Sequence, residues 1–141
     1  RLPDHEADFR ANADALMADL DELDAALQSA GERLAGVPLV ASHPVYQYLS
    51  RRYGFAIEAL YWEPEMVISE SDLADLQALR EEHPATWVIW EDQPTQASRE
   101  TLAERGIFSI VFNPCGNRPE AGDWLSVMRV NIAQLEIIEP E

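Results

Sequence analysis

The chain has 141 residues, enough for one domain with a substantial core, and 47% of them are hydrophobic, as expected of a globular protein. Its 26 acidic residues against 10 basic ones give a net charge of −16, and such a surface repels phosphate backbones and anionic lipid, so we expect no nucleic-acid partner. All ten basic residues are arginine, and the absence of lysine excludes P-loop phosphate binding and Schiff-base chemistry.

Cys115 is the only cysteine, so the chain has no internal disulfide and no CxxC metal knuckle. No apolar run reaches 18 residues, the length expected of a membrane-spanning helix. The sequence starts at Arg1 without a methionine, and we therefore expect a fragment or a processed product.

Residues 4–35 are predicted to form one long helix that Gly36 ends. Its apolar residues alternate at spacings of four and three, which places them on a single stripe: Phe9, Ala13, Leu16, Leu20, Leu23, Leu27, Ala30 and Leu34. The outer face lacks the opposite-charge pairs that a coiled coil would use. We therefore expect one face of the helix to dock on a domain and to bury four leucines, Leu16, Leu20, Leu23 and Leu27.

Residues 38–41 form a short apolar run, long enough for a buried strand and too short for a helix. Pro44 suits the first position of a helix, so His43 is predicted to be the N-cap of a helix that Gly54 ends. A histidine at the carboxyl end of a strand can ligate a metal, shuttle protons or bind an anion. A lone histidine can equally do no more than cap its helix, so His43 alone defines no site.

The rest of the chain alternates strands with helices. Strands are predicted near 38–42, 55–61, 86–91 and 107–112, and further helices at 71–82, capped by Ser71, at 97–105 and at 122–136. This alternation predicts a parallel sheet with helices on both faces. The predicted fold class is therefore α/β, a three-layer sandwich with a four-stranded parallel sheet and a long N-terminal helix, in a single domain over residues 1–141.

Three predicted strands end in polar residues at the same edge of the sheet. His43 follows the first strand, Glu91 and Asp92 follow the third, and Asn113 follows the fourth. An imidazole, a carboxylate and an amide oxygen that converge there would form half of a metal site. The alternative for Glu91 and Asp92 is ordinary solvation, or charge at a helix N-terminus.

The remaining reactive side chains have simpler interpretations. His5 and His83 are expected to be solvated, and Cys115 is expected to be a buried, unreactive thiol. Three tryptophans are interpreted as core or lobe-interface residues: Trp62, Trp87 and Trp90.

Several blocks follow one another in a distinctive order: the long acidic helix, SHPVYQYLSRRYG, a WEP loop, a leucine-bearing helix, VIWED, a strand leading into FNP, and GDWLSVMRVNIAQL. This order resembles the C-terminal lobe of the zinc and manganese substrate-binding proteins of bacterial ABC transporters, the cluster whose two lobes are joined by a long helix. The resemblance covers essentially the whole chain.

The resemblance implies candidate metal ligands. In that family the residue matching His43 binds the metal and is histidine in zinc-type members and glutamate in several manganese-type members. The position matching Asn113 is usually aspartate, and asparagine offers only a neutral oxygen. Glu91 is a candidate substitute, although the family's acidic residue there does not usually contact the metal. The candidate ligands in this chain are therefore His43, Asn113 and Glu91.

The resemblance also implies a function. It implies a periplasmic or extracytoplasmic protein, not an enzyme, that binds zinc, or less favourably manganese, and delivers it to the membrane permease of an ABC transporter. Two further family ligands are histidines of an N-terminal lobe, which is absent from this chain, so the chain alone is expected to bind zinc weakly.

Two other classes of function fit the sequence less well. One is a small α/β hydrolase-like enzyme that uses His43 with Glu91, although no GxSxG motif is present. The other is a receiver-type regulatory domain, which the missing lysine and the missing acidic pair after the first strand disfavour.

Overall fold

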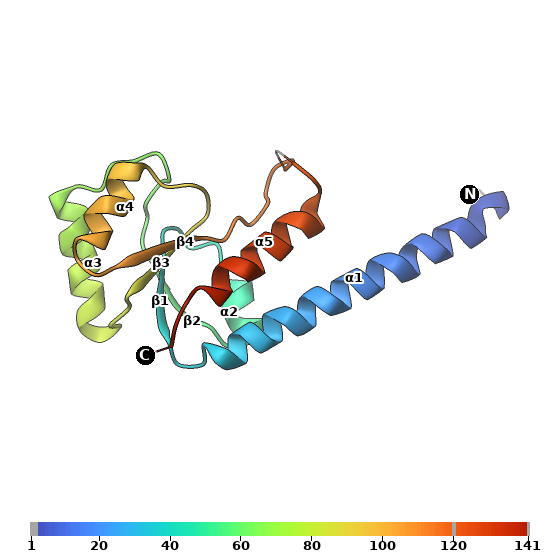
Figure 1. Cartoon of the computed structure of the whole chain (residues 1–141), viewed down its shortest axis with the longest axis horizontal. Coiled ribbons are helices and arrows are strands. Elements are labelled where there is room, and N and C mark those ends of the chain that lie inside the picture. Colours follow the sequence, from blue (N-terminus) through green and yellow to red (C-terminus); the bar gives the residue numbers. More distant parts are fainter. Residues whose placement is uncertain (1–2, 120, 141) are drawn as a thin grey trace.

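The computed structural model describes residues 3–119 and 121–140 of the chain. A short 3-10 helix precedes nine further elements: η1 (Pro3–His5), α1 (Glu6–Arg33), β1 (Pro38–Ala41), α2 (Gln47–Tyr53), β2 (Ala56–Ala59), α3 (Glu70–Glu82), β3 (Trp87–Trp90), α4 (Gln96–Ala103), β4 (Phe108–Val111) and α5 (Trp124–Glu136). Figure 1 traces them along the chain.

The four strands form one parallel sheet in the order β2-β1-β3-β4. In the two central strands, Val40 of β1 lies opposite Val88 of β3, and both side chains are completely buried. Because all four strands run in the same direction, their carboxyl ends share one edge of the sheet.

Helices cover both faces of this sheet (Figure 1). On one face, α1, α2 and α5 pack with the sheet around a core that includes Leu27, Leu34, Leu39, Tyr46, Ile89, Phe112 and Leu135. On the other face, α3 and α4 close a second core that includes Val40, Trp62, Leu76, Val88, Trp90 and Leu102. The predicted three-layer α/β sandwich is therefore confirmed, and Trp62, Trp87 and Trp90 are core or core-packed residues as expected.

Two helix starts differ from the sequence prediction. His43 is not the N-cap of α2, because Val45 donates its backbone N–H to the carbonyl of His43 (2.9 Å) and the first helical bond runs from Ser50 to Tyr46. The N-cap of α3 is Ser69 rather than Ser71. The Ser69 hydroxyl accepts a hydrogen bond from the Asp72 N–H, and the Asp72 carboxylate accepts one from the Ser69 N–H (2.8 Å).

The long first helix agrees with the prediction in position and differs from it in burial. Leu23 and Leu27 are buried, Leu20 is half-buried and Leu16 is 50% exposed, so the prediction of substantial burial is wrong for Leu16. The reason is that the N-terminal half of α1 extends past the sheet and its covering helices (Figure 1).

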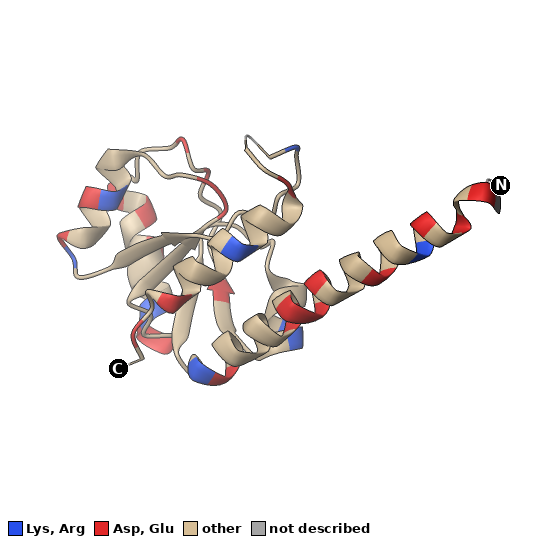
Figure 2. Ribbon diagram, turned by 45° about the vertical axis from the view of Figure 1, so that its right-hand side comes forward, with Lys and Arg blue, Asp and Glu red and all other residues tan. Residues whose placement is uncertain are grey.

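Acidic residues are spread along the ribbon rather than collected in one segment, and several lie on the extended part of α1 (Figure 2). None of the described helices is both long and apolar enough to cross a membrane.

Candidate metal site

The carboxyl edge of the sheet continues past the strands, by one residue after β1 and β4 and by three residues after β2. Ser42 donates its N–H to the Ile89 carbonyl, Trp62 to the Ser42 carbonyl and Phe112 to the Trp90 carbonyl, each at 2.8 Å. The next residue along each strand is polar. In the order of the sheet, these residues are Glu63, His43, Glu91 and Asn113. Neighbouring strands lie about 4.8 Å apart, so these side chains start out within reach of their neighbours.

Three of the four residues form a compact cluster. Ligand atoms of His43, Glu63 and Glu91 all lie within 4.8 Å of one another, and Nδ1 of His43 is 4.0 Å from Oε1 of Glu63. The His43 side chain is 27% exposed and that of Glu63 is 65% exposed. Nδ1 of His43 is itself buried and has no hydrogen-bond partner among the described residues. The cluster therefore combines an unsatisfied imidazole nitrogen with two carboxylates.

Aromatic neighbours hold this edge together. The ring of Tyr61 meets the His43 ring edge-on, with 6.0 Å between the centroids. The hydroxyl of Tyr46 donates to the carbonyl of Phe112 (2.7 Å), which ties α2 to the end of β4. Burial, and to a lesser extent the nearby charge of Glu91, raise the pKa of Tyr46 well above its usual range, so its hydroxyl stays a neutral donor.

Asn113 lies at the same edge with its polar groups engaged. Its side-chain oxygen accepts the N–H of Cys115 (2.7 Å), and the side chain of Asn131 bonds to both its N–H (2.9 Å) and its carbonyl (2.7 Å). Asn113, Glu63 and Glu91 line one open polar cavity of about 780 Å³ above the sheet edge. Whether Asn113 binds a metal stays a prediction.

Glu63 is the member of the cluster that sequence reasoning missed. The strand predicted near 55–61 ends before Glu63, which falls in the WEP loop, so the sequence does not group it with the residues that end the other strands. The one signal for it in the sequence is that Glu63 directly follows the mostly apolar segment 55–62, although it lies four residues past the end of β2.

The other reactive residues lie outside the cluster. His83 is half-buried and its Nε2 is 2.9 Å from the carbonyl of Leu39, so the expectation that it is solvated is wrong. His5 is exposed as expected. Cys115 lines the polar cavity in the left-handed backbone region (φ 57°) and is only partly buried, which corrects the expectation of a buried thiol.

The fold and the edge cluster define a parallel α/β domain with a candidate metal site. A sequence model of the family described as "ZnuA: Zinc-uptake complex component A periplasmic" matches residues 2–137, and the chain belongs to this family.

Relatives and solved structures agree with this assignment. The zinc-binding lipoprotein AdcA of Streptococcus pneumoniae, in strains R6 and TIGR4, is 30% identical over 99% of this chain. The zinc-bound ZnuA-like domain of AdcA superposes with a TM-score of 0.80 and 27% identity over 95% of this chain. The metal-dependent lipoprotein YcdH of Bacillus subtilis, at 22% identity and a TM-score of 0.81, supports the fold.

The chain matches only part of each of these proteins. It spans 31% of the length of AdcA, and 53% of each of the two solved chains.

Proposed function

We propose that this chain is the C-terminal lobe of the metal-binding component of a bacterial zinc ABC transporter. The lobe acts outside the cytoplasm, in the periplasm or at the cell surface, and is not an enzyme. It holds the ion at the carboxyl edge of its sheet, and the whole protein delivers that ion to a membrane permease. Family membership and the AdcA relatives, which are named as zinc-binding lipoproteins, support this proposal.

One observation carries the proposal. The buried and unpartnered Nδ1 of His43 lies beside two carboxylates, at the edge where open α/β sheets hold ligands. Buried polar atoms in proteins normally have a bonding partner, and one divalent cation can bind the imidazole and both carboxylates. Imidazole is a borderline donor that suits zinc better than manganese, so zinc is the preferred ion.

The site in this chain is a half-site. Zinc in proteins normally takes four protein ligands, or three with a water molecule. His43 and Glu91 supply two of the proposed ligands, and Asn113 offers at best a neutral oxygen. We propose that an N-terminal lobe supplies the remaining ligands. The hydrolase alternative, His43 with Glu91, receives no support from the comparisons.

Zinc calorimetry on the purified chain tests the proposal. We expect weak binding that falls sharply in His43→Ala, because this variant removes the principal donor. His5→Ala is the matched control, since His5 is exposed at the start of α1, whose N-terminal end lies far from the sheet (Figure 1), and this variant should bind zinc as the wild type does. Submicromolar affinity that survives His43→Ala would place the site elsewhere and overturn the proposal.

A further inference from the structure

We infer that Glu63 and Glu91 both bind the metal with His43, so that this chain supplies one imidazole and two carboxylates to the site. The inference rests on the proposed function and adds to it a ligand, Glu63, from the loop between β2 and α3. The site then has a carboxylate on each side of His43, Glu63 after β2 and Glu91 after β3.

The arrangement of the three residues suits a shared ion. His43 follows the central strand β1, while Glu63 and Glu91 follow the strands on either side of it, so the imidazole stands between two carboxylates. Bonds of about 2.0 Å in a tetrahedral site separate ligand atoms by about 3.3 Å. The observed separations of 4.0 Å and at most 4.8 Å exceed this by roughly an ångström, which small rotations of the exposed Glu63 side chain and of the half-buried Glu91 side chain can supply.

The backbone of Glu63 is held although its side chain is exposed. Its carbonyl accepts the N–H of Met66 (3.2 Å), and the carbonyl of the buried Pro64 accepts the N–H of Thr95 at the start of α4 (3.2 Å). Ordering Glu63 around an ion would therefore fix a few side-chain torsions rather than a loop, and this lowers the entropic cost of binding.

The carboxylates of the cluster form no ion pair with an arginine. Within the described part of the chain, Glu63 pairs only with the His43 ring, and Arg118 lines the same cavity without lying within ion-pair distance of Glu63 or Glu91. Two carboxylates this close repel each other in the absence of a cation. The two carboxylates together balance the charge of one divalent ion, and a neutral imidazole adds a ligand without adding charge.

Asn113 has a different task in this arrangement. Its side-chain oxygen closes a turn onto Cys115, and its backbone is held by the buried side chain of Asn131. These bonds fix the loop after β4. We therefore assign Asn113 to the shape of the cavity and the carboxylate ligands to Glu63 and Glu91.

Zinc calorimetry on four variants of the full chain tests this assignment. Glu63→Gln and Glu91→Gln should each weaken zinc binding by about tenfold or more, since even the loss of an outer-shell partner of a metal costs this much. Two matched controls, Glu65→Gln and Asp92→Asn, remove neighbouring carboxylates that line the same cavity but lie outside the cluster. They should change the affinity by less than about twofold, because these exposed carboxylates are not proposed ligands and salt screens their charges.

A fifth variant separates coordination from simple attraction. Glu63→Asp keeps the charge and shortens the side chain, so it should bind zinc as poorly as Glu63→Gln, with a loss that persists in 1 M sodium perchlorate. Zinc affinity close to wild type in Glu63→Asp, or in Glu63→Gln while His43→Ala has lost binding, would overturn the assignment of Glu63 and leave the proposed function standing. A wild-type chain in which zinc binding does not depend on His43 would overturn both.

Discussion

The two halves of α1 carry the same apolar stripe in different surroundings. In the C-terminal half, Leu23, Leu27 and Ala30 are buried against the rest of the domain. In the N-terminal half, the large apolar residues Phe9, Leu16 and Met17 are 55%, 50% and 56% exposed. Figure 1 shows the reason, because the helix continues well beyond the sheet and its covering helices.

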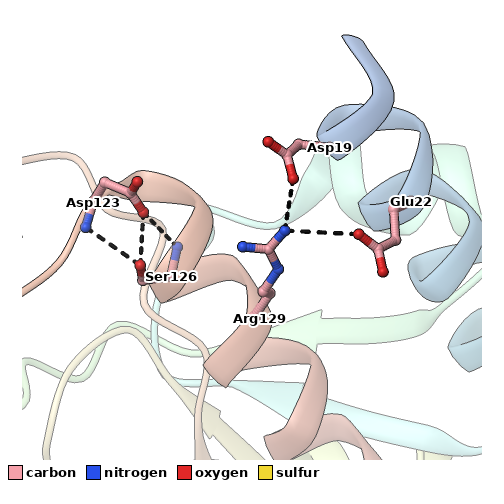
Figure 3. A network of polar contacts seen from close by, with 5 residues as sticks. All are labelled: Asp19, Glu22, Asp123, Ser126 and Arg129. Carbon is pink, nitrogen blue, oxygen red and sulfur yellow. Dashed lines mark hydrogen bonds and ion pairs between the residues drawn. The ribbon is translucent and has the colours of Figure 1, made fainter. Parts of the chain in front are cut away.

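The boundary between the halves is marked by polar contacts. Arg129 of α5 lies 2.8 Å from the carboxylate of Asp19 and 3.7 Å from that of Glu22 (Figure 3). In Figure 1 the N-terminal part of α1 runs clear of the sheet and of the helices that cover it. An amphipathic stripe thus indicates that a helix needs an apolar partner, but not that the partner belongs to the same domain. In the two-lobed protein that we propose, the other lobe would cover the exposed half.

The largest difference is expected from matched leucine truncations in the two halves. Leu27→Ala should lower the free energy of unfolding by about 2–5 kcal/mol, because it leaves a cavity in a packed core. Leu16→Ala should change it by less than about 0.5 kcal/mol, because Leu16 is half exposed. Urea denaturation of both variants measures the contrast. Equal costs would mean that the two halves of α1 are packed alike in solution.

A smaller effect is expected where α1 meets α2. Gly31 is buried, and a Cβ added there would lie 2.0 Å from the carbonyl oxygen of Tyr53. Gly→Ala within a helix normally stabilises by up to about 1 kcal/mol, but at this contact Gly31→Ala should destabilise by roughly 1–3 kcal/mol.

Ser29→Ala, at an exposed position of the same helix, is the control for Gly31→Ala and should have little effect in the same denaturation experiment. A Gly31→Ala variant more stable than the wild type would show that α1 and α2 approach each other less closely than this contact requires.

The fold followed from local patterns because short apolar runs alternate with helical segments along the chain. Apolar runs such as 86–91 between helical segments predict buried parallel strands, and the observed strands lie inside the predicted ranges. The burial of Leu16 could not be predicted in the same way. The stripe on α1 is continuous through Leu16 and Leu20, and only the position of the other helices decides which part of it is covered.

The candidate site followed only in part. His43 and Glu91 could be placed at one edge because each lies at the carboxyl end of a predicted buried strand. Glu63 was harder to place, because the chain after β2 pairs irregularly with β1. Leu60 donates its N–H to the Ala41 carbonyl, and Trp62 donates its N–H to the Ser42 carbonyl. Between these two bonds the chain after β2 advances by two residues while the chain after β1 advances by only one. Such a shift in register depends on tertiary packing and brings Glu63 beside His43.

The smallest expected effect is a pH-dependent contact in the packed half of α1. The Asp24 carboxylate accepts a hydrogen bond from the Tyr53 hydroxyl (2.7 Å) and two from the guanidinium of Arg52 (2.7 Å each). The bond from Tyr53 first, and those from Arg52 next, lower the pKa of Asp24 below its usual value of 3.8. A carboxyl group with a lowered pKa in the folded state stabilises the fold above its unfolded pKa, and this contribution is lost as the pH falls through the folded pKa.

Asp24→Asn should therefore have a lower free energy of unfolding than the wild type at pH 7, and this gap between the two proteins should narrow below pH 3.8. Urea denaturation at pH 7 and at a pH below 3.8 measures this gap. Asp14→Asn, in the exposed half of α1, is the control and should be as stable as the wild type at both pH values. A gap that is the same at both pH values would show that the charge of Asp24 contributes nothing to the packing of α1 on α2.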